Sequence, residues 1–203
     1  MAAKNELSHL EKIRNLIKNL NGPFLTSDLE KAGIPRIYLT ILERNGEIER
    51  VSRGIYRKPA SIDDPLFNFQ ARYKSVIFSH ETAVSLHDLT DRTPSVYSVS
   101  VPIGYHSISL NRSGHHIYYV NRSLFDIGLV MIKDSYGNDI RATNLERTIC
   151  DIFRSRNQLG SQFVSNVLKK YEIHKGRNIN RLYDYTKQFQ IQKVFREYIE
   201  TIL

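Results

Sequence analysis

Apolar residues near the start of the chain recur at steps of three and four, which is the period of one helix face. The first such series is Leu7, Leu10, Ile13, Leu16, Ile17 and Leu20. Asn21-Gly22-Pro23 ends this helix, because Gly adopts the left-handed helix terminus and Pro cannot continue the turn. Ser27 followed by Glu30 is a capping-box pattern that begins a short second helix. Pro35 opens a third helix, which we expect to run to about Asn45.

An alternating segment follows the third predicted helix. Residues 47–57 alternate between polar and apolar positions and contain Gly54, a pattern that predicts a two-stranded hairpin. Helices joined by a Gly-containing turn are typical of the helix-turn-helix motif, and the hairpin adds a wing. We therefore expect residues 1–60 to form a winged helix-turn-helix domain.

The third predicted helix and the hairpin carry the candidate DNA contacts. Ile34, Ile37 and Ile41 form an apolar stripe of the helix. The predicted DNA contacts are Arg36, Thr40 and Arg44 on another stripe of the helix and Arg50, Arg53 and Arg57 on or near the hairpin. A helix fits the major groove, and Arg binds guanine edges or phosphates. A winged helix that binds a protein instead is the alternative.

A polar stretch bounded by prolines, residues 59–65, predicts a linker over residues 61–74 and a second domain over residues 75–203. Strands are predicted at residues 76–78, 96–101, 107–110, 117–120 and 129–132. Helices are predicted at residues 79–87, 143–153, 161–172, 180–189 and 191–202, with Thr143 and Glu146 as a capping box. The predicted fold class is α+β: a small, mostly antiparallel sheet with helices gathered towards the C-terminus.

Composition and charge narrow the class of protein. The 203 residues include 41% hydrophobic residues and one cysteine, Cys150, which excludes an intrachain disulfide framework. The apolar stretches are too short to cross a membrane, and the first ten residues lack the apolar core of a secretory signal. We therefore expect a soluble cytoplasmic protein that is not attached to a membrane.

The net charge of +8 is unevenly distributed along the chain. Residues 1–60 contain 11 basic and 7 acidic residues, residues 61–153 contain 8 and 10, and residues 154–203 contain 10 and 4. Two basic ends around a near-neutral middle favour an anionic partner, most simply DNA; solvated surface charge is the alternative. Secondary DNA contacts are predicted at Lys169, Lys170, Arg177 and Arg181.

Motifs for catalysis and metal binding are incomplete. The segment His80-Glu81-Thr82-Ala83-Val84 has Val84 where a zinc protease needs its second histidine. The sequence contains no Gly-Lys pair for a phosphate-binding loop, no G-x-S-x-G elbow and no acidic residue with Lys two positions later. We therefore expect neither an enzyme nor a metal or cofactor site.

Several motifs in order resemble one known family. They are Arg53-Gly54-Ile55-Tyr56 and residues 78–90, 94–102 and 141–151. Over residues 10–155 the chain resembles the AbiEi family of abortive-infection antitoxins and transcriptional regulators. The resemblance implies a bacterial type IV toxin–antitoxin system, in which the winged helix represses its own operon by binding inverted repeats in the promoter. It also implies a C-terminal domain that counters a nucleotidyltransferase-like toxin without a stable complex.

Six polar residues of the second domain are candidates for an antitoxicity surface: Ser79, Thr82, His87, Glu146, Arg147 and Asp151. The structural alternative is that they cap and pack helices, with Arg147 and Asp151 paired at i, i+4. Likewise, the basic C-terminal residues could bind an RNA substrate of the toxin instead of DNA.

The sequence as a whole predicts a two-domain antitoxin and autorepressor without catalytic activity. The chain lacks coiled-coil heptads, so we expect a monomer in solution that binds two DNA repeats side by side and cooperatively. One alternative is an ordinary winged-helix transcription factor with a ligand-sensing or oligomerising C-terminal domain. Another is a hydrolase or nuclease with an appended winged helix, which the missing motifs disfavour.

Overall fold

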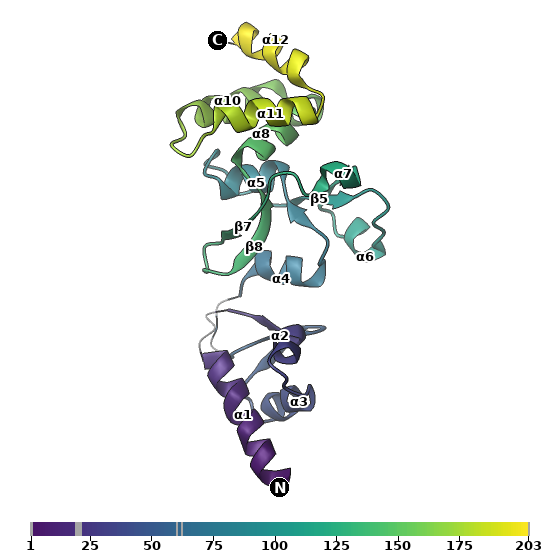
Figure 1. The fold of residues 1–203 in the computed structure, drawn as a ribbon, viewed down its shortest axis with the longest axis vertical. Helices are drawn as coiled ribbons and strands as arrows, with labels where there is room; N and C mark the ends of the chain where they lie inside the picture. Colours follow the sequence, from purple (N-terminus) through teal and green to yellow (C-terminus); the bar gives the residue numbers. More distant parts are fainter. Residues whose placement is uncertain (1, 19–21, 60, 62, 203) are drawn as a thin grey trace. The chain divides into compact units, whose positions relative to one another are not determined.

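The computed structural model describes residues 2–18, 22–59, 61 and 63–202 (Figure 1). The chain divides into two compact units. The first unit contains the residues up to Lys74 together with Lys133–Ile140, and the second contains Ser75–Ile132 together with the residues from Arg141 onward. Each unit is described by itself below.

Helices and a small antiparallel sheet make up most of the first unit. Its elements up to residue 57 are α1 (Ala2–Lys18), β1 (Phe24–Leu25), α2 (Thr26–Lys31), α3 (Ile37–Arg44), β2 (Glu49–Ser52) and β3 (Ile55–Arg57). The sheet has the strand order β1-β3-β2. The three helices and the hairpin follow in the order that the sequence predicts, whereas strand β1 is not predicted. Leu20 and Asn21, at the predicted end of the first helix, lie outside the described residues.

The start of each short helix differs from the prediction. The backbone N–H of Leu25 donates to Asp28 Oδ2 at 2.9 Å, so the capping carboxylate of α2 belongs to Asp28 rather than Glu30. Helix α3 begins at Ile37, and its buried residues are Tyr38, Leu39 and Leu42. Ile37 is 61% exposed, so its predicted place in the apolar stripe is wrong: the helix starts two residues later than Pro35, and Tyr38 and Leu39 face the core instead.

The predicted linker contains a helix, α4 (Pro65–Arg72). Asp64 caps it, because its carboxylate accepts a hydrogen bond from the Phe67 N–H at 3.0 Å. The side-chain amide of Asn138 donates to the same carboxylate at 2.6 Å. Residues 133–140, which the sequence assigns to the second domain, therefore belong to the first unit, since tertiary contacts bring distant segments together.

The second unit is built on a five-stranded sheet with the order β6-β5-β4-β8-β7. Its strands are β4 (Ile77–Phe78), β5 (Ser98–Pro102), β6 (His116–Val120), β7 (Leu129–Lys133) and β8 (Asp139–Thr143), and the tip of the β7–β8 hairpin belongs to the first unit. β4 pairs antiparallel with β5, whereas β4–β8 and β5–β6 are parallel. The α+β class is confirmed, but this sheet is mixed, because long connections between those strands permit parallel pairing.

The helices described in the second unit include three short ones, of four residues each, that the sequence does not predict. The helices of this unit are α5 (His80–Leu86), α6 (Ile108–Asn111), α7 (Arg122–Phe125), α8 (Leu145–Arg154), α9 (Arg156–Leu159), α10 (Ser161–Ile173), α11 (Ile179–Gln188) and α12 (Gln192–Ile202). The sequence predicts a strand at residues 107–110, but Ile108–Asn111 form α6, because the Ser107 hydroxyl accepts from the Leu110 N–H and caps a helix. Asn144 rather than Thr143 caps α8, by accepting from the Arg147 N–H at 2.9 Å.

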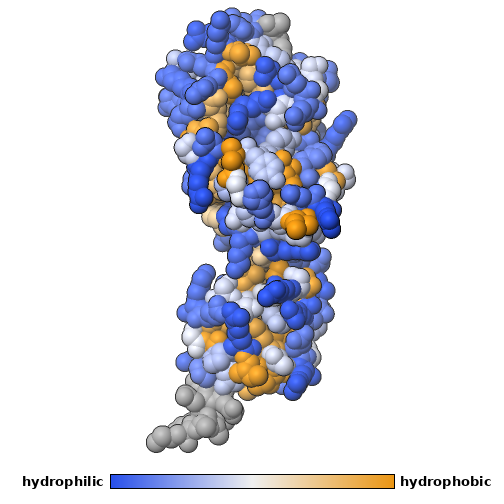
Figure 2. Space-filling view, turned by 90° about the vertical axis from the view of Figure 1, so that its right-hand side faces the viewer, coloured by the Kyte–Doolittle hydropathy of each residue, from blue (hydrophilic) through white to orange (hydrophobic). Residues whose placement is uncertain are grey.

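Each unit has its own apolar core. Ile13, Leu29 and Leu42 are fully buried in the first, and Ile149 and Ile152 of α8 are fully buried in the second. On the face shown in Figure 2, hydrophobic residues lie in separate groups between hydrophilic ones. Within the described part of the chain, no helix has the length and apolar character that a membrane crossing requires.

Candidate nucleic-acid interface

Helix α3 presents a polar face to solvent. Leu39 and Leu42 anchor the helix in the core. Ile37, Thr40 and Arg44 lie at i, i+3 and i+7 on the opposite side and are exposed. In the part of the chain that the structure describes, the Arg44 guanidinium has no ion-pair or hydrogen-bond partner, so it is available to an external ligand.

Arg36 is placed differently from the rest of its predicted stripe. It is the N-cap residue of α3, and its Nε donates to Glu30 Oε1 of α2 at 2.6 Å. Both side chains remain substantially exposed, and exposed pairs of this kind contribute only about 0–1 kcal/mol. Arg36 is therefore held towards α2, and its pairing with Glu30 competes with binding to a phosphate.

The β2–β3 hairpin carries two arginines that face solvent. Arg53 lies at the turn beside Gly54, whose φ of +76° suits a residue without a side chain, and Arg50 lies on β2. Arg50 Nε donates only to the Ser52 carbonyl, at 3.3 Å, and Arg53 has no side-chain partner among residues 22–59. Both cations are thus available on the hairpin, Arg53 at its turn and Arg50 on β2.

Arg57 is committed to contacts within the first unit. Its guanidinium forms ion pairs with Glu49 and with Asp63, the latter at 3.3 Å. Its side chain is only 26% exposed. Arg57 therefore fastens β3 to β2 and to the segment that follows, and of the six predicted contacts it is the least free to bind DNA.

Two further residues belong to the exposed face of α3. Ile37 and Glu43 are both exposed, and neither is among the six contacts that the sequence predicts. The helix phase, which follows from which side chains reach the core, identifies them. Periodicity counted from Ile34 placed Ile37 on the wrong side.

The candidate antitoxicity residues of the second unit do not form a surface. Ser79, Thr82, Glu146, Arg147 and Asp151 are at most 3% exposed, and His87 is half-buried. They lie in the interior because α8 is covered by α5, α10 and α11. The expectation of a surface made from these residues is therefore corrected, whereas the alternative pairing of Arg147 with Asp151 is formed.

Arg147 holds α8 against the segment between β6 and β7. Its Nε lies 2.9 Å from Asp151 Oδ1, and its Nη1 donates to the carbonyls of Leu124 and Ile127 at 2.8 and 2.9 Å. Its guanidinium also lies over the Phe189 ring, 4.2 Å from the centroid. A buried cation with these partners is a structural element rather than a binding group.

Glu146 connects α8 to the segment between α10 and α11. Its carboxylate accepts from the Asn178 N–H at 2.8 Å and from Arg181 Nη1 at 3.3 Å. The Tyr171 hydroxyl approaches the same carboxylate at 3.4 Å. Burial and the nearby charge of Glu146 raise the pKa of Tyr171, so the phenol stays protonated and donates.

His80 lies at the centre of a buried chain of hydroxyl groups. Ser100 donates to Ser79 at 2.8 Å, and the Ser79 hydroxyl lies 2.9 Å from His80 Nδ1. His80 Nε2 lies 3.1 Å from the Ser155 hydroxyl, and in a neutral imidazole one ring nitrogen donates while the other accepts. Burial lowers the pKa of His80 to about 4, so the ring is neutral and stacks on Tyr118.

The remaining two candidates in this region also tie elements together. Thr82 accepts from the Ser98 N–H at 2.8 Å, which joins α5 to β5. His87 Nε2 donates to the Thr143 carbonyl at 2.7 Å, which joins the end of α5 to the end of β8. Burial lowers the pKa of His87 as well.

Of the four basic residues predicted as secondary DNA contacts, two form ion pairs within the second unit and two do not. Lys170 is paired with Asp91 at 2.8 Å, and Arg181 with Glu146. Lys169 and Arg177 are exposed and have no side-chain partner among residues 63–202. Of these four residues, Lys169 and Arg177 are therefore free to contact a phosphate without competing with an ion pair.

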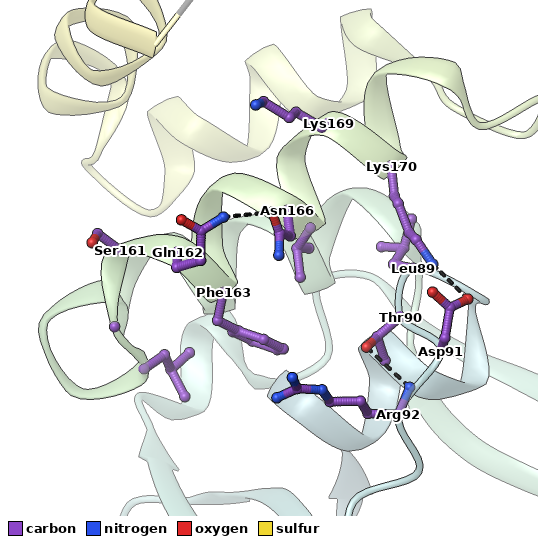
Figure 3. A pocket seen from close by; sticks show the side chains of 13 residues that line it. Leu89, Thr90, Asp91, Arg92, Ser161, Gln162, Phe163, Asn166, Lys169 and Lys170 are labelled. Atoms are coloured by element: carbon purple, nitrogen blue, oxygen red, sulfur yellow. Dashed lines mark hydrogen bonds and ion pairs between the residues drawn. The ribbon is translucent and has the colours of Figure 1, made fainter.

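A cavity of about 840 Å³ lies between the Leu89–Arg92 segment and α10 (Figure 3). Gln162 donates to Asn166 across one turn of α10 at 2.9 Å, and Lys170 is paired with Asp91. Arg92 extends towards Phe163 in this view. Cavities of roughly 300–1,000 Å³ accommodate small ligands in many proteins, although here most of the polar lining groups bind one another.

Comparison with known proteins finds a similar family for the N-terminal region and a similar fold for the chain. No curated protein matches the chain in a sequence search. Among solved structures, the RV2827C protein from Mycobacterium tuberculosis is similar, with a TM-score of 0.53 at 14% identity over 89% of this chain and 71% of that one; this likeness concerns the fold. Residues 11–59 match the family model described as "Transcriptional regulator, AbiEi antitoxin". Residues 11–59 of this chain are therefore similar to the AbiEi family of antitoxins and transcriptional regulators, and this likeness concerns the N-terminal region.

Proposed function

We propose that the protein is the antitoxin of a type IV toxin–antitoxin system of abortive infection, and that it represses its own operon by binding inverted repeats in the promoter. The observation that carries the DNA-binding part is the exposed face of α3, with Thr40 and an unpaired Arg44. It lies in a region that matches a transcriptional-regulator family. The protein acts by binding and has no catalytic step of its own.

The positions of the basic residues in the first unit support different DNA-binding roles for helix α3 and the hairpin. Helix α3 enters the major groove, where Arg44 binds a guanine edge. Arg50 and Arg53 of the hairpin contact phosphates, which orient the protein without reading sequence. Lys169 and Arg177 add phosphate contacts to flanking DNA. A monomer occupies each repeat, and two monomers bind side by side and cooperatively.

The antitoxin part rests on the family rather than on an assigned surface. The second unit counters a nucleotidyltransferase-like toxin in the cytoplasm without a stable complex. Co-expression with such a toxin from a neighbouring gene tests this part: restored growth supports it, and growth arrest in the presence of the folded protein contradicts it.

Salt-varied mobility shifts with the DNA directly upstream of the gene test the DNA-binding part. Arg44→Ala should weaken binding by about 1–3 kcal/mol and reduce discrimination between sequences. Arg53→Ala should weaken binding to all sequences alike and reduce the slope of log affinity against log salt by about 1. Lys187→Ala, an exposed lysine of α11, is the control. Absent or unselective binding by the wild-type chain would contradict the proposal.

A second candidate function is an ordinary transcription factor whose second unit senses a ligand. The cavity beside α10 favours it, because its volume suits a small molecule. DNA binding is common to both candidates, so toxin neutralisation is the property that separates them.

A further inference from the structure

Ile37 is unusual among the apolar residues of the first unit. It is 61% exposed, whereas Ile13, Ile34, Ile48 and Ile55 are at most 3% exposed. Among the large apolar side chains of residues 9–18, 22–59, 63–74 and 133–140, Ile37 is the most exposed, followed by Tyr136 at 40%. It is the first residue of α3 and shares its face with Thr40 and Arg44.

The surroundings of Ile37 favour a DNA groove over an apolar protein partner. Protein interfaces bury contiguous apolar patches, whereas Ile37 is a single apolar side chain on a face with Thr40 and Arg44. Arg36, its neighbour in the chain, is held towards Glu30 at 2.6 Å. The side chain of Ile37 thus projects from the start of the helix into solvent and lies next to polar groups.

Base edges in the major groove offer one apolar feature, the C5-methyl group of thymine. Residues near the N-terminus of a recognition helix contact base edges most directly, and Ile37 is at that end of α3. We infer that Ile37 is a specificity-determining residue that packs on a thymine methyl group in each DNA half-site. This inference rests on the proposed function and assigns a base preference to it.

The spacing along α3 relates this thymine to the base that Arg44 contacts. Seven residues of helix span about 10 Å at a rise of about 1.5 Å per residue. At about 3.4 Å per base pair, the two contacts lie roughly three base pairs apart where the helix follows the groove. The expected half-site therefore has a thymine and a guanine at about this separation.

Replacement of thymine by deoxyuridine tests the contact, because it removes the methyl group and keeps base pairing. The full-length wild-type chain first selects sites from a random duplex library, and each thymine of the selected site is then replaced in turn. At one thymine per half-site, wild-type affinity should fall about fourfold, the factor expected for one buried methyl group. Ile37→Ala should bind the thymine and deoxyuridine sites equally.

Two controls separate this contact from a general loss of binding. Arg36→Ala should keep the thymine preference of the wild type, because Arg36 is turned towards α2. Ile37 is exposed, so Ile37→Ala should retain the wild-type circular dichroism spectrum and melting temperature.

Two different outcomes separate the thymine contact of Ile37 from the proposed DNA-binding function on which it rests. An Ile37→Ala protein that still prefers thymine to deoxyuridine as strongly as the wild type overturns this inference alone. A wild-type chain that selects no DNA sequence overturns the proposed function and this inference with it.

Discussion

Asp64 shows how one side chain in the first unit responds to its environment. It is fully buried, caps α4 and accepts from Asn138. Asp134 lies beside it, and Asp134 Oδ2 is buried without a hydrogen-bond donor among the described residues. Burial, followed by a hydrogen bond to Asp134 that Asp64 can donate only when protonated, raises the pKa of Asp64 to about 6. A protonated Asp64 supplies the donor that this oxygen lacks.

This arrangement predicts that Asp64 stabilises the first unit in acid. Its pKa in the folded protein exceeds the ordinary value of 3.8, so its contribution is complete below about pH 3.8 and is lost as pH rises through about 6. The loss amounts to at most about 3 kcal/mol. Asp64→Asn should remove this pH dependence, because Asn still accepts from the Phe67 N–H but does not titrate.

Urea denaturation between pH 4 and pH 7, followed by the NMR signals of α3 amides, measures this effect. Asp63→Asn is the matched control, because Asp63 is an exposed neighbour. Identical pH dependence in the wild type and Asp64→Asn would show that Asp64 has no raised pKa.

At the scale of an element, α8 organises the second unit. Nine of its ten residues are buried, and a helix buried on all sides needs partners for its polar groups. Arg147 finds them in Asp151 and in the carbonyls that precede Gly128. Gly128 lies close to α8: a Cβ atom at this position would be 2.6 Å from Arg147 Cβ.

Gly128→Ala should therefore destabilise the second unit by about 2–4 kcal/mol, through backbone strain at φ +71° and a contact with α8 that neither side can relieve easily. Gly114→Ala is the matched control: its φ is +75°, and nothing lies within 4 Å of the added Cβ. It should cost only the strain, about 1 kcal/mol. Denaturation curves of the two variants measure the difference, and equal losses would argue against the close approach to α8.

At the scale of the whole molecule, the two units contain buried groups that titrate in opposite senses. Burial raises the pKa of Asp64 in the first unit and lowers that of His80 in the second. Because His80 is neutral in the fold, its contribution is present above about pH 6.5 and is lost as pH falls through about 4. Acidification thus strengthens the contribution of Asp64 to the stability of the first unit and weakens that of His80 to the second.

His80→Asn should flatten the pH dependence of the second unit between pH 4 and pH 7, which in the wild type amounts to about 3 kcal/mol. Asn tolerates the positive φ of 47° found at this position and carries no charge. Hydrogen exchange of α8 and α3 amides, corrected for intrinsic rates, reports the two units separately. An unchanged pH response of α8 amides in His80→Asn would contradict the assignment to His80.

Local patterns in the sequence determine much of this protein. The helical period of the first residues, the Gly54 turn and the C-terminal helices are predicted because nearby residues impose them. The exposed cations Arg44 and Arg53 follow in the same way, since charged side chains remain in water unless a partner holds them.

Tertiary structure decided the features that depend on distant residues. It buried Glu146, Arg147 and Asp151 together, added β8 to the sheet, and joined residues 133–140 to the first unit. It also turned Ile37 outward and Tyr38 inward. Periodicity states that a helix has an apolar face, but the residues that pack against the helix decide which side chains belong to it, and they come from elsewhere in the chain.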